Sequence, residues 1–348
     1  MFVPKLMNLN TPTALPSPPR RNVPLAWFVV GIVVAAGLSV TGVAVVYADR
    51  TNPPPGPITV TDDLGRQVSV PDDPAHVVVL GPSIMDSMFR LGLRDHVVGV
   101  DCYAPALGGL AEDYSADQIA LWNLSSSMCV EVEPSFDTEA LLALGPGLIL
   151  ASTIVPVAAM EQFSDTYRIP VVFLQPATLG GIAIDVQLLA TIFGVRAPTD
   201  ALEAAIDAEL ANATELGANL TSNATPFPTV LLTYYADSNG YWTYGPGTFG
   251  LSLIELASGS SISANSTASY PELSAEQVLA SDPNCIVYGT GFGLNESSYS
   301  DGPFWSDFSA TKDGRAVGMD SNYFTEPDPT MILVGLPALI AVLHPPSS

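Results

Sequence analysis

The stretch that decides the fold is Asp137-Thr-Glu-Ala-Leu-Leu-Ala-Leu-Gly-Pro-Gly-Leu-Ile-Leu150, because its pattern returns as Ser274-Ala-Glu-Gln-Val-Leu-Ala-Ser-Asp-Pro-Asn-Cys-Ile-Val287. Each copy begins with a residue whose short oxygen-bearing side chain favours a helix N-cap, and a glutamate, Glu139 or Glu276, follows two positions later. A Leu-Ala pair then leads to a proline, which ends the helix, and to an apolar run typical of a buried strand. The two helix-then-strand units predict two lobes of one architecture, each with a glutamate on the first turn of a helix.

Outward from these units, apolar strands alternate with helices, as in βαβ units built around a parallel sheet. A β-hairpin is predicted over 58–70, and further strands over 76–80, 97–100, 171–174 and 229–233. Helices are predicted over 84–91, 157–167, 249–257 and 330–343. The sequence also favours a polar and aromatic loop over 234–244 and a hairpin around Asp313-Gly314. The predicted fold class is α/β, with two Rossmann-like lobes that contain parallel sheets.

A long helical stretch separates the two lobes. From Gly180 to Asn223 the only proline is Pro198, and apolar residues recur at helical spacing. We expect a single long connector helix, with a kink or a cap near Ala197-Pro-Thr199. The predicted bounds are 58–178 for the N-terminal ligand-binding lobe, 179–224 for the connector helix and 225–348 for the C-terminal ligand-binding lobe.

The N-terminal residues predict a membrane anchor. Residues 1–22 form a polar, Pro-rich tail with three cations, and residues 23–48 contain no charged side chain, which is enough for a helix to cross the roughly 30 Å hydrocarbon core of a bilayer. Cations before this segment and acids after it predict a cytoplasmic tail, one transmembrane helix and an extracytoplasmic domain, held at the cell membrane through a stiff Pro-rich linker over 49–57. A signal peptide cleaved near Val46-Tyr-Ala48 is the alternative.

The part beyond this segment is strongly acidic. All 35 Asp and Glu residues lie at or beyond Asp49, but three of the 11 Lys and Arg residues (Lys5, Arg20 and Arg21) lie before it, which leaves eight. Nucleic acids and anionic membrane surfaces need clustered cations, so this composition disfavours both as partners. A solvated acidic coat suited to high salt or low pH is the simplest interpretation.

Three cysteines are too few for a disulfide scaffold. In an oxidising compartment Cys102 and Cys129 have the option of a disulfide, whereas Cys285, in an apolar run, is expected to be a buried hydrophobic residue. The spacing of cysteines and histidines gives no metal motif, and we expect neither a bound metal nor a cofactor.

Six Asn-X-Ser/Thr sequons favour a glycosylated surface. The Ser and Thr content gives roughly two by chance, so six is an excess. Chance combined with Ser/Thr-rich loops is the alternative. The acceptor residues are Asn123, Asn212, Asn219, Asn223, Asn265 and Asn295.

The sequence offers little machinery for catalysis. Its three histidines, His76, His96 and His344, fall near a strand start, in a loop and at the end of the last helix. No nucleophile elbow, P-loop or Gly-rich dinucleotide turn is present in the chain. We therefore expect a binding protein and not an enzyme.

Ligands of parallel α/β sheets bind beyond the carboxyl ends of the strands. The loops that follow the predicted strands carry hydroxyl groups and aromatic rings, which suit a bulky, partly apolar ligand. Packing of some of these rings in the core is the alternative. The candidate ligand-binding residues are Ser83, Tyr103, Ser152, Thr153, Tyr235, Trp242, Tyr270, Phe292 and Tyr323.

Several segments from Ile58 onward follow one another in a characteristic order. They are Ile58-Thr-Val-Thr-Asp-Asp-Leu-Gly-Arg66, Val98-Gly-Val-Asp-Cys-Tyr103, Thr138-Glu-Ala-Leu-Leu-Ala-Leu-Gly-Pro146, Leu253-Ile-Glu-Leu-Ala-Ser-Gly259, Tyr270-Pro-Glu-Leu-Ser-Ala-Glu-Gln-Val-Leu-Ala280, and Phe304-Trp305 with Lys312-Asp-Gly-Arg315. As an ordered set they resemble the long-helix class of substrate-binding proteins of ABC importers, the family that captures cobalamin, ferric siderophores or haem.

The resemblance implies two Rossmann-like lobes joined by one rigid helix, with modest hinge motion on ligand binding. It also implies that Glu139 and Glu276 are carboxylates at the tips of the lobes that pair with arginines of a permease dimer. Two acids at matched positions suit charge-assisted contacts with a two-fold symmetric partner. The alternative role is stabilisation of a helix N-terminus, worth about 0.3–1 kcal/mol.

By the same resemblance, Tyr103, Tyr270 and Trp122 match aromatic pocket positions of the cobalamin-binding members, although a Ser/Cys insertion follows Trp122. The chain departs from the family where Glu326 and Thr330 stand, since basic residues often occur there. It departs again after each helix-ending proline, where Gly147 and Asn284 replace the usual aspartate.

A cleft with so few cations favours a corrinoid or a neutral or cationic iron chelate over strongly anionic catecholate complexes. The predicted function is the extracytoplasmic substrate-binding component of an ABC importer. It captures an iron chelate (siderophore or haem) or cobalamin and delivers it to the permease. A surface sensor or scavenging binding protein of the same fold, without a transport partner, is the alternative.

Overall fold

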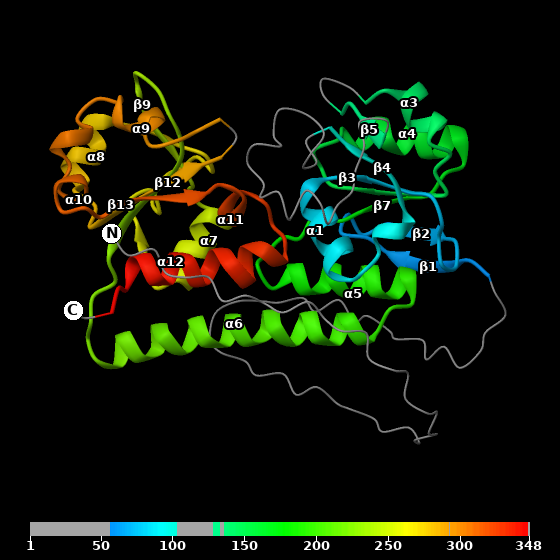
Figure 1. The fold of residues 1–348 in the computed structure, drawn as a ribbon, viewed down its shortest axis with the longest axis horizontal. Coiled ribbons are helices and arrows are strands. Elements are labelled where there is room, and N and C mark those ends of the chain that lie inside the picture. The colour runs from blue at the N-terminus through cyan, green and yellow to red at the C-terminus, as the bar shows by residue number, and fades with distance from the viewer. Residues whose placement is uncertain (1–55, 103–127, 133–135, 292, 347–348) are drawn as a thin grey trace. The chain divides into compact units, whose positions relative to one another are not determined.

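The computed structural model describes residues 56–102, 128–132, 136–291 and 293–346 of the chain (Figure 1). All of them belong to one compact unit. The predicted tail, the transmembrane segment 23–48 and most of the linker 49–57 therefore lie outside the described residues. Within the described part of the chain, no helix combines the length and the apolar character needed to cross a bilayer.

The N-terminal lobe is built on a five-stranded sheet in which every pairing is parallel, in the order β5-β4-β3-β6-β7. Its strands are β3 (Val77–Leu80), β4 (Val97–Asp101), β5 (Cys129–Val130), β6 (Leu148–Ala151) and β7 (Val171–Phe173). Its helices are α1 (Pro82–Arg90), α3 (Thr138–Ala143) and α4 (Val157–Tyr167), with a short 3-10 turn η1 (Arg94–His96) before β4. The predicted hairpin is present as β1 (Ile58–Thr61) and β2 (Gln67–Val70).

The strands β3 and β6 are buried along their whole length, because helices cover both faces of their sheet. Val77 and Val79 contribute to one apolar cluster with residues of α1 and of the helix that follows β7. Val78 and Leu80, which alternate with them, contribute to a second cluster with α3 and α4. This two-sided burial explains why the strands read as unbroken apolar runs.

The C-terminal lobe contains a six-stranded sheet with the order β11-β9-β8-β12-β13, and β10 also pairs with β8. Strands β8, β10, β12 and β13 pair in parallel, whereas β9 and β11 add antiparallel pairings. The strands are β8 (Thr229–Ala236), β9 (Gly240–Thr243), β10 (Ser260–Ser261), β11 (Glu272–Ser274), β12 (Cys285–Thr290) and β13 (Ala316–Asp320). The helical elements are α7 (Phe249–Leu256), α8 (Ala275–Ser281), α9 (Ser297–Ser300), η4 (Trp305–Asp307), α10 (Ser309–Lys312) and α11 (Asn322–Thr325).

Two sequence predictions for this lobe are wrong. The stretch 234–244 is not a loop, because β8 continues to Ala236 and turns into β9 at Asp237, whose carboxylate accepts backbone N–H groups of Asn239 and Gly240. The turn at Asp313-Gly314 does not close a hairpin. It joins α10 to β13, which pairs in parallel with β12.

The connector differs from the single helix expected over 179–224. It consists of α5 (Gly181–Phe193) and α6 (Ala197–Ser222), because Gly194 takes a left-handed conformation with φ of 68° and ends α5. Only α6, at 26 residues, is a long helix. Leu202, Ile206 and Ala213 on α6 are buried in the same apolar cluster as core residues of both lobes. Figure 1 shows α6 running beside α5 and the last helix, α12.

The chain ends in a π-helical turn, η5 (Met331–Gly335), that continues into α12 (Leu336–Leu343). At Gly335 an added Cβ would clash with the carbonyl oxygen of Tyr323, so this close approach to α11 requires glycine. The predicted helix over 330–343 is thus present, with a π-helical first part.

Candidate ligand-binding site

The carboxyl ends of the N-terminal strands meet in a tightly packed group. The backbone N–H of Gly81, after β3, donates a hydrogen bond of 2.8 Å to the carboxylate of Asp101 at the end of β4. A Cβ at Gly81 would lie 2.8 Å from the hydroxyl oxygen of Ser152, which follows β6. Ser83, one residue into α1, is buried beside them. Two predicted residues, Ser83 and Ser152, therefore belong to one strand-end group in the N-terminal lobe.

Three tyrosines form an aromatic group in the C-terminal lobe. The ring of Tyr270 lies edge-on to those of Tyr234 and Tyr244, with centroids 6.2 and 6.0 Å away, and the latter two are 5.0 Å apart. Tyr244 is buried and also contacts Phe324, whereas Tyr270 is 56 % exposed. Burial raises the pKa of Tyr244 well above its ordinary value. An open ring supported by one buried and one half-buried ring is a suitable surface for a flat, partly apolar ligand.

The other predicted aromatic residues are placed separately. Tyr235 and Trp242 are cross-strand partners in β8 and β9, and Tyr235 is exposed. The buried indole N–H of Trp242 has no hydrogen-bond partner in the described residues. Tyr323, on α11, is half-buried, and burial raises the pKa of its hydroxyl, with a smaller contribution from Asp320. Tyr103, Trp122 and Phe292 lie outside the described residues.

Sequence reasoning selected Tyr235 and Trp242 from the stretch 234–244 but missed Tyr234 and Tyr244, because a stretch interpreted as a loop does not show which rings share a face of a sheet. Two runs of apolar, aromatic and β-branched residues, 230–235 and 241–244, flank the turn residues Asp237-Ser-Asn-Gly240, and this hairpin signal would have placed them on a sheet. Their contact with Tyr270 has no local signal.

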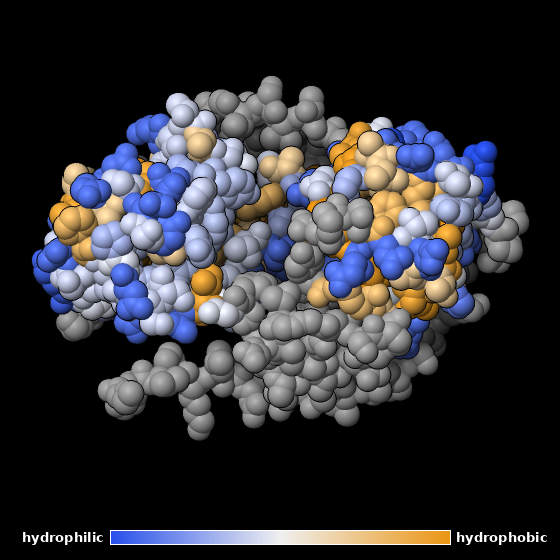
Figure 2. Space-filling view, turned by 90° about the horizontal axis from the view of Figure 1, so that it is seen from above, coloured by the Kyte–Doolittle hydropathy of each residue, from blue (hydrophilic) through white to orange (hydrophobic). Residues whose placement is uncertain are grey.

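The two lobes meet where the loop after α11 reaches α1. The carboxylate of Asp86 accepts hydrogen bonds from the backbone N–H (3.2 Å) and the hydroxyl (3.1 Å) of Thr330. Arg90 donates to the same hydroxyl at 2.7 Å and forms an ion pair of 2.7 Å with Asp86. Figure 2 shows that the surface is hollowed between the two lobes.

Acidic groups gather at this junction. Burial, with a contribution from Asp101, raises the pKa of Glu326 to about 7. Asp328 is buried and accepts the backbone N–H of Met331 at 2.9 Å, and burial together with Asp86 raises its pKa. Both carboxyl groups therefore bind protons more readily than an exposed acid does, and Glu326 changes charge near neutral pH.

A third buried acid, Asp185 of α5, lines a small cavity with room for about one water molecule. Serine side chains of α1 and Pro327 of the junction loop also line the cavity. Burial, followed by the nearby charge of Asp63, raises the pKa of Asp185 to about 9. This carboxyl group is thus protonated at neutral pH.

Glu139 and Glu276 occupy matched places on two short helices. Asp137 caps α3 by accepting the backbone N–H groups of Glu139 (2.9 Å) and Ala140 (3.0 Å). Ser274 caps α8 in a capping box, and its hydroxyl also donates to Glu276 at 2.8 Å. Both glutamates are exposed, and hydrogen bonds lower the pKa of Glu276. The repeated unit therefore presents one exposed carboxylate on each lobe, as the sequence predicted.

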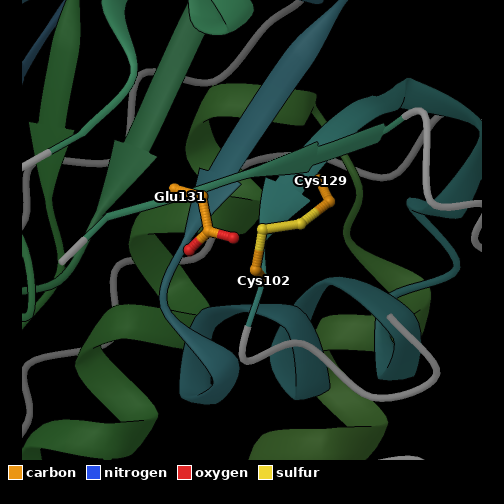
Figure 3. A group of neighbouring side chains, drawn as sticks. All are labelled: Cys102, Cys129 and Glu131. Carbon is orange, nitrogen blue, oxygen red and sulfur yellow. A yellow bond between two sulfur atoms is a disulfide. The ribbon is translucent and has the colours of Figure 1, made fainter. Parts of the chain in front are cut away.

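The cysteines do not provide a metal site. Cys102 and Cys129 form a disulfide that joins the end of β4 to β5, with the carboxylate of Glu131 close to the sulfur atoms (Figure 3). Sulfur atoms in a disulfide are not thiolates, which metal ligation requires. Cys285 is buried and not disulfide-bonded, as predicted.

The comparisons with known proteins agree with this architecture. A family model described as periplasmic binding protein matches residues 77–323. The chain is 27 % identical over 296 residues to a cobalamin-binding protein of Halobacterium salinarum, covering 82 % of this chain and 74 % of the relative.

Two solved structures share the fold. The molybdate-binding protein MolA of Haemophilus influenzae superposes with a TM-score of 0.68 at 20 % identity, over 83 % of this chain and 91 % of that one. A periplasmic haem-binding protein of Pseudomonas aeruginosa gives 0.64 at 21 %, over 79 % and 94 %. The family match covers more than half of the sequence, and the chain therefore belongs to the periplasmic binding protein family, whose members are ligand carriers of ABC transporters.

Proposed function

We propose that this chain is the extracytoplasmic substrate-binding component of an ABC importer, which captures cobalamin or an iron chelate (a siderophore or haem) and delivers it to a permease dimer. The matched placement of Glu139 and Glu276 carries the proposal. Each is exposed on the first turn of a short helix whose N-cap fixes that turn, and each lobe presents one. A two-fold symmetric partner with an arginine on each half suits this arrangement.

The ligand class rests on the aromatic group and on the similarity to the cobalamin-binding protein. Tyr270 offers an open ring, and two hydroxyl groups, those of Ser83 and Ser152, lie at strand ends of the other lobe. A corrinoid or a metal chelate has the size and the mixed polarity for such walls. The proposed ligand-binding residues are Ser83, Tyr103, Trp122, Ser152, Tyr235, Trp242, Tyr270, Phe292 and Tyr323.

The proposal also includes membrane anchoring, the domain bounds and glycosylation. Residues 23–48 would anchor it as a single-pass helix, and the bounds 58–178, 179–224 and 225–348 remain the proposed domains. Five sequon asparagines are exposed in the described residues. Two of them, Asn212 and Asn219, lie on α6 seven residues apart and thus on one helix face, and Asn223 is the C-cap residue of the same helix. The proposed glycan acceptors are Asn123, Asn212, Asn219, Asn223, Asn265 and Asn295.

A ligand panel tests the binding function. Cyanocobalamin, cobinamide, haemin, a ferric hydroxamate and a ferric catecholate are each added to the purified domain, and the unfolding midpoint is measured. A ligand at about 100 times its Kd stabilises the native state by about 2.7 kcal/mol, so a binder raises the midpoint. Tyr270→Ala should weaken the best binder at least tenfold, whereas the matched control Tyr167→Ala, an exposed tyrosine of α4, should not. A panel with no shift at all contradicts the proposal.

Docking of the protein to its permease is tested by uptake. Cells express the protein together with an importer permease encoded beside its gene, and uptake of the labelled ligand is measured. Glu139→Arg combined with Glu276→Arg should abolish uptake while leaving the Kd for the ligand unchanged. The control pair Glu215→Arg and Glu296→Arg makes the same charge change at exposed positions elsewhere and should preserve uptake. Binding and uptake both unaffected by the first pair would refute the docking role of Glu139 and Glu276. Ligand binding by the wild type without any uptake would instead favour a sensor or scavenger without a transport partner.

A further inference from the structure

Most cationic side chains in the described residues lie away from the carboxyl ends of the strands. Arg94, Arg168 and Arg315 precede β4, β7 and β13, so they lie at the amino ends of these strands. Arg94 donates to the carbonyl of Val97, and Arg315 to that of Asn284, just before β12. The carboxyl ends, where ligands of such sheets bind, are at the opposite edge.

The remaining described cations are also engaged elsewhere, with one exception. Arg66 pairs with Asp62 and donates to the carbonyl of Val171, the first residue of β7. Lys312 donates to the carbonyl of Asp307, and Arg196 is exposed at the start of α6. The exception is Arg90 at the lobe junction, which is paired with Asp86. Segments 103–127 and 133–135 contain no Lys or Arg in the sequence.

Acids occupy the positions at which an anionic ligand would need cations. Asp101 ends β4 of the N-terminal lobe and is fully buried, and Glu326 follows α11 at the carboxyl end of β13 in the C-terminal lobe. Gly81, whose N–H bonds to Asp101, directly precedes α1, and Ser83 of α1 lines a cavity together with Pro327, the neighbour of Glu326. On the other side, Phe324, two residues before Glu326, contacts Tyr244 of the aromatic group. The acid pair and the aromatic group therefore belong to one site.

Resting on the proposed function, we propose that Asp101 and Glu326 set the charge class of the ligand: the cleft takes a corrinoid or metal chelate of zero or positive charge and rejects anionic complexes. An anion brought to this site loses its hydration and lies near two acids, while Arg90, the cation at the junction, is already paired with Asp86, so binding of the anion is opposed. A cation in the same place compensates the acid pair. Glu326 is thus a specificity-determining residue.

Two series of probes that differ only in charge test this. The first is ferrioxamine B, which carries a free ammonium group, with its neutral N-acetyl and anionic N-succinyl derivatives. The second is cationic cobinamide, neutral cyanocobalamin and the monocarboxylate made by hydrolysing one peripheral amide of cyanocobalamin. Titration calorimetry at pH 7.5 should show the Kd rising at least tenfold from the most positive to the anionic member of whichever series binds.

The variants locate the effect. The preference is the ratio of the Kd of the anionic probe to that of the most positive probe. Glu326→Gln should reduce this ratio at least fivefold with little change in side-chain shape, and Glu326→Arg should reverse the preference. Glu296→Gln removes one exposed acid and controls for overall charge, so it should leave the order unchanged. If the anionic member binds best to the wild type, or if Glu326→Gln keeps the full preference, the specificity proposal fails while the binding function stands. If no member of either series binds, both fail.

Discussion

The carboxylate of Asp86 accepts two hydrogen bonds from Thr330, and these bonds join a helix of one lobe to the first turn of the terminal helical segment of the other. Arg90 completes the group by donating to the Thr330 hydroxyl. This is a direct polar connection between the lobes in addition to the core shared along α6. It fixes the junction loop Glu326–Thr330 against α1. A conservative substitution of Thr330 can therefore measure what these hydrogen bonds contribute to stability.

Thr330→Val removes the hydroxyl and preserves the side-chain shape and the backbone hydrogen bond. The loss leaves Arg90 and Asp86 each one partner short, so the free energy of unfolding should fall by about 1–2 kcal/mol. Urea unfolding of the soluble domain measures the change. Thr166→Val is the matched control, because the exposed Thr166 hydroxyl donates to the carbonyl of Gln162 in its own helix, α4. Equal effects of the two substitutions would show that the junction bonds add nothing.

Asp185 should make the protein less stable as the pH rises. Its pKa is about 9 in the folded state against an ordinary value of 3.8, so the folded state holds the proton more tightly than the unfolded state. The associated stability is complete below about pH 4 and is lost as the pH rises through about 9. Asp185→Asn cannot ionise, and it should flatten the decline of the unfolding midpoint between pH 5 and 9.

The exposed Asp207 of α6 supplies the control for that experiment, since Asp207→Asn removes a carboxyl group from solvent and not from the interior. A wild-type midpoint that stays level over this range, or a slope that Asp185→Asn leaves intact, would refute the assignment.

Removing the disulfide should destabilise the domain. The bond closes a loop with a sequence separation of 27 residues, for which loop-closure entropy gives about 3–4 kcal/mol. Cys102→Ser combined with Cys129→Ser should lower the free energy of unfolding by that amount. Reductant should lower the stability of the wild type similarly and leave the double variant unchanged. A reductant effect of equal size on both proteins would trace the loss to another cause.

The affinity for a cationic ligand should depend on pH through Glu326. Asp101 from β4 raises the pKa of Glu326, and Glu326 in turn raises the pKa values of Tyr244 after β9 and of Asp328 in its own loop. The pKa of Glu326 is about 7, and a cation favours the ionised form, so protons compete with the ligand. The Kd for the cationic probe should fall from pH 6 to pH 8. The neutral probe, and the cationic probe with Glu326→Gln, should show a smaller dependence; an equally steep one would remove Glu326 from the explanation.

Local signals in the sequence predicted much of the fold. The repeated unit was found as α3 followed by β6 and α8 followed by β12, because an N-cap, a terminating proline and an apolar run each act within a few residues. The helix predicted over 157–167 coincides with α4. The predictions failed where strand pairing is decided by residues far apart in the sequence. The turn at Asp313-Gly314 resembles a hairpin turn, but the strand after it, β13, pairs in parallel with β12, which itself pairs with β8.

The site was less predictable than the fold, for the same physical reason. Ser83 and Ser152 were found because each follows a recognisable strand. The contact of Tyr270 with Tyr234 and Tyr244 arises from residues up to 36 positions apart, and Asp185 differs from a surface acid only in lying on the apolar face of α5. The ligand-binding role of every candidate residue stays a prediction, as do the anchor and the glycosylation of all six sequon asparagines.

The bond between Cys102 and Cys129 also changes what a protease can do to the protein. It makes the intervening chain part of a covalent ring. A single peptide cut anywhere inside that ring leaves the two fragments attached, so the nicked protein migrates as one chain until it is reduced. The ring includes Tyr103 and Trp122, two of the proposed ligand-binding residues, so nicked protein keeps both tethered to the sheet.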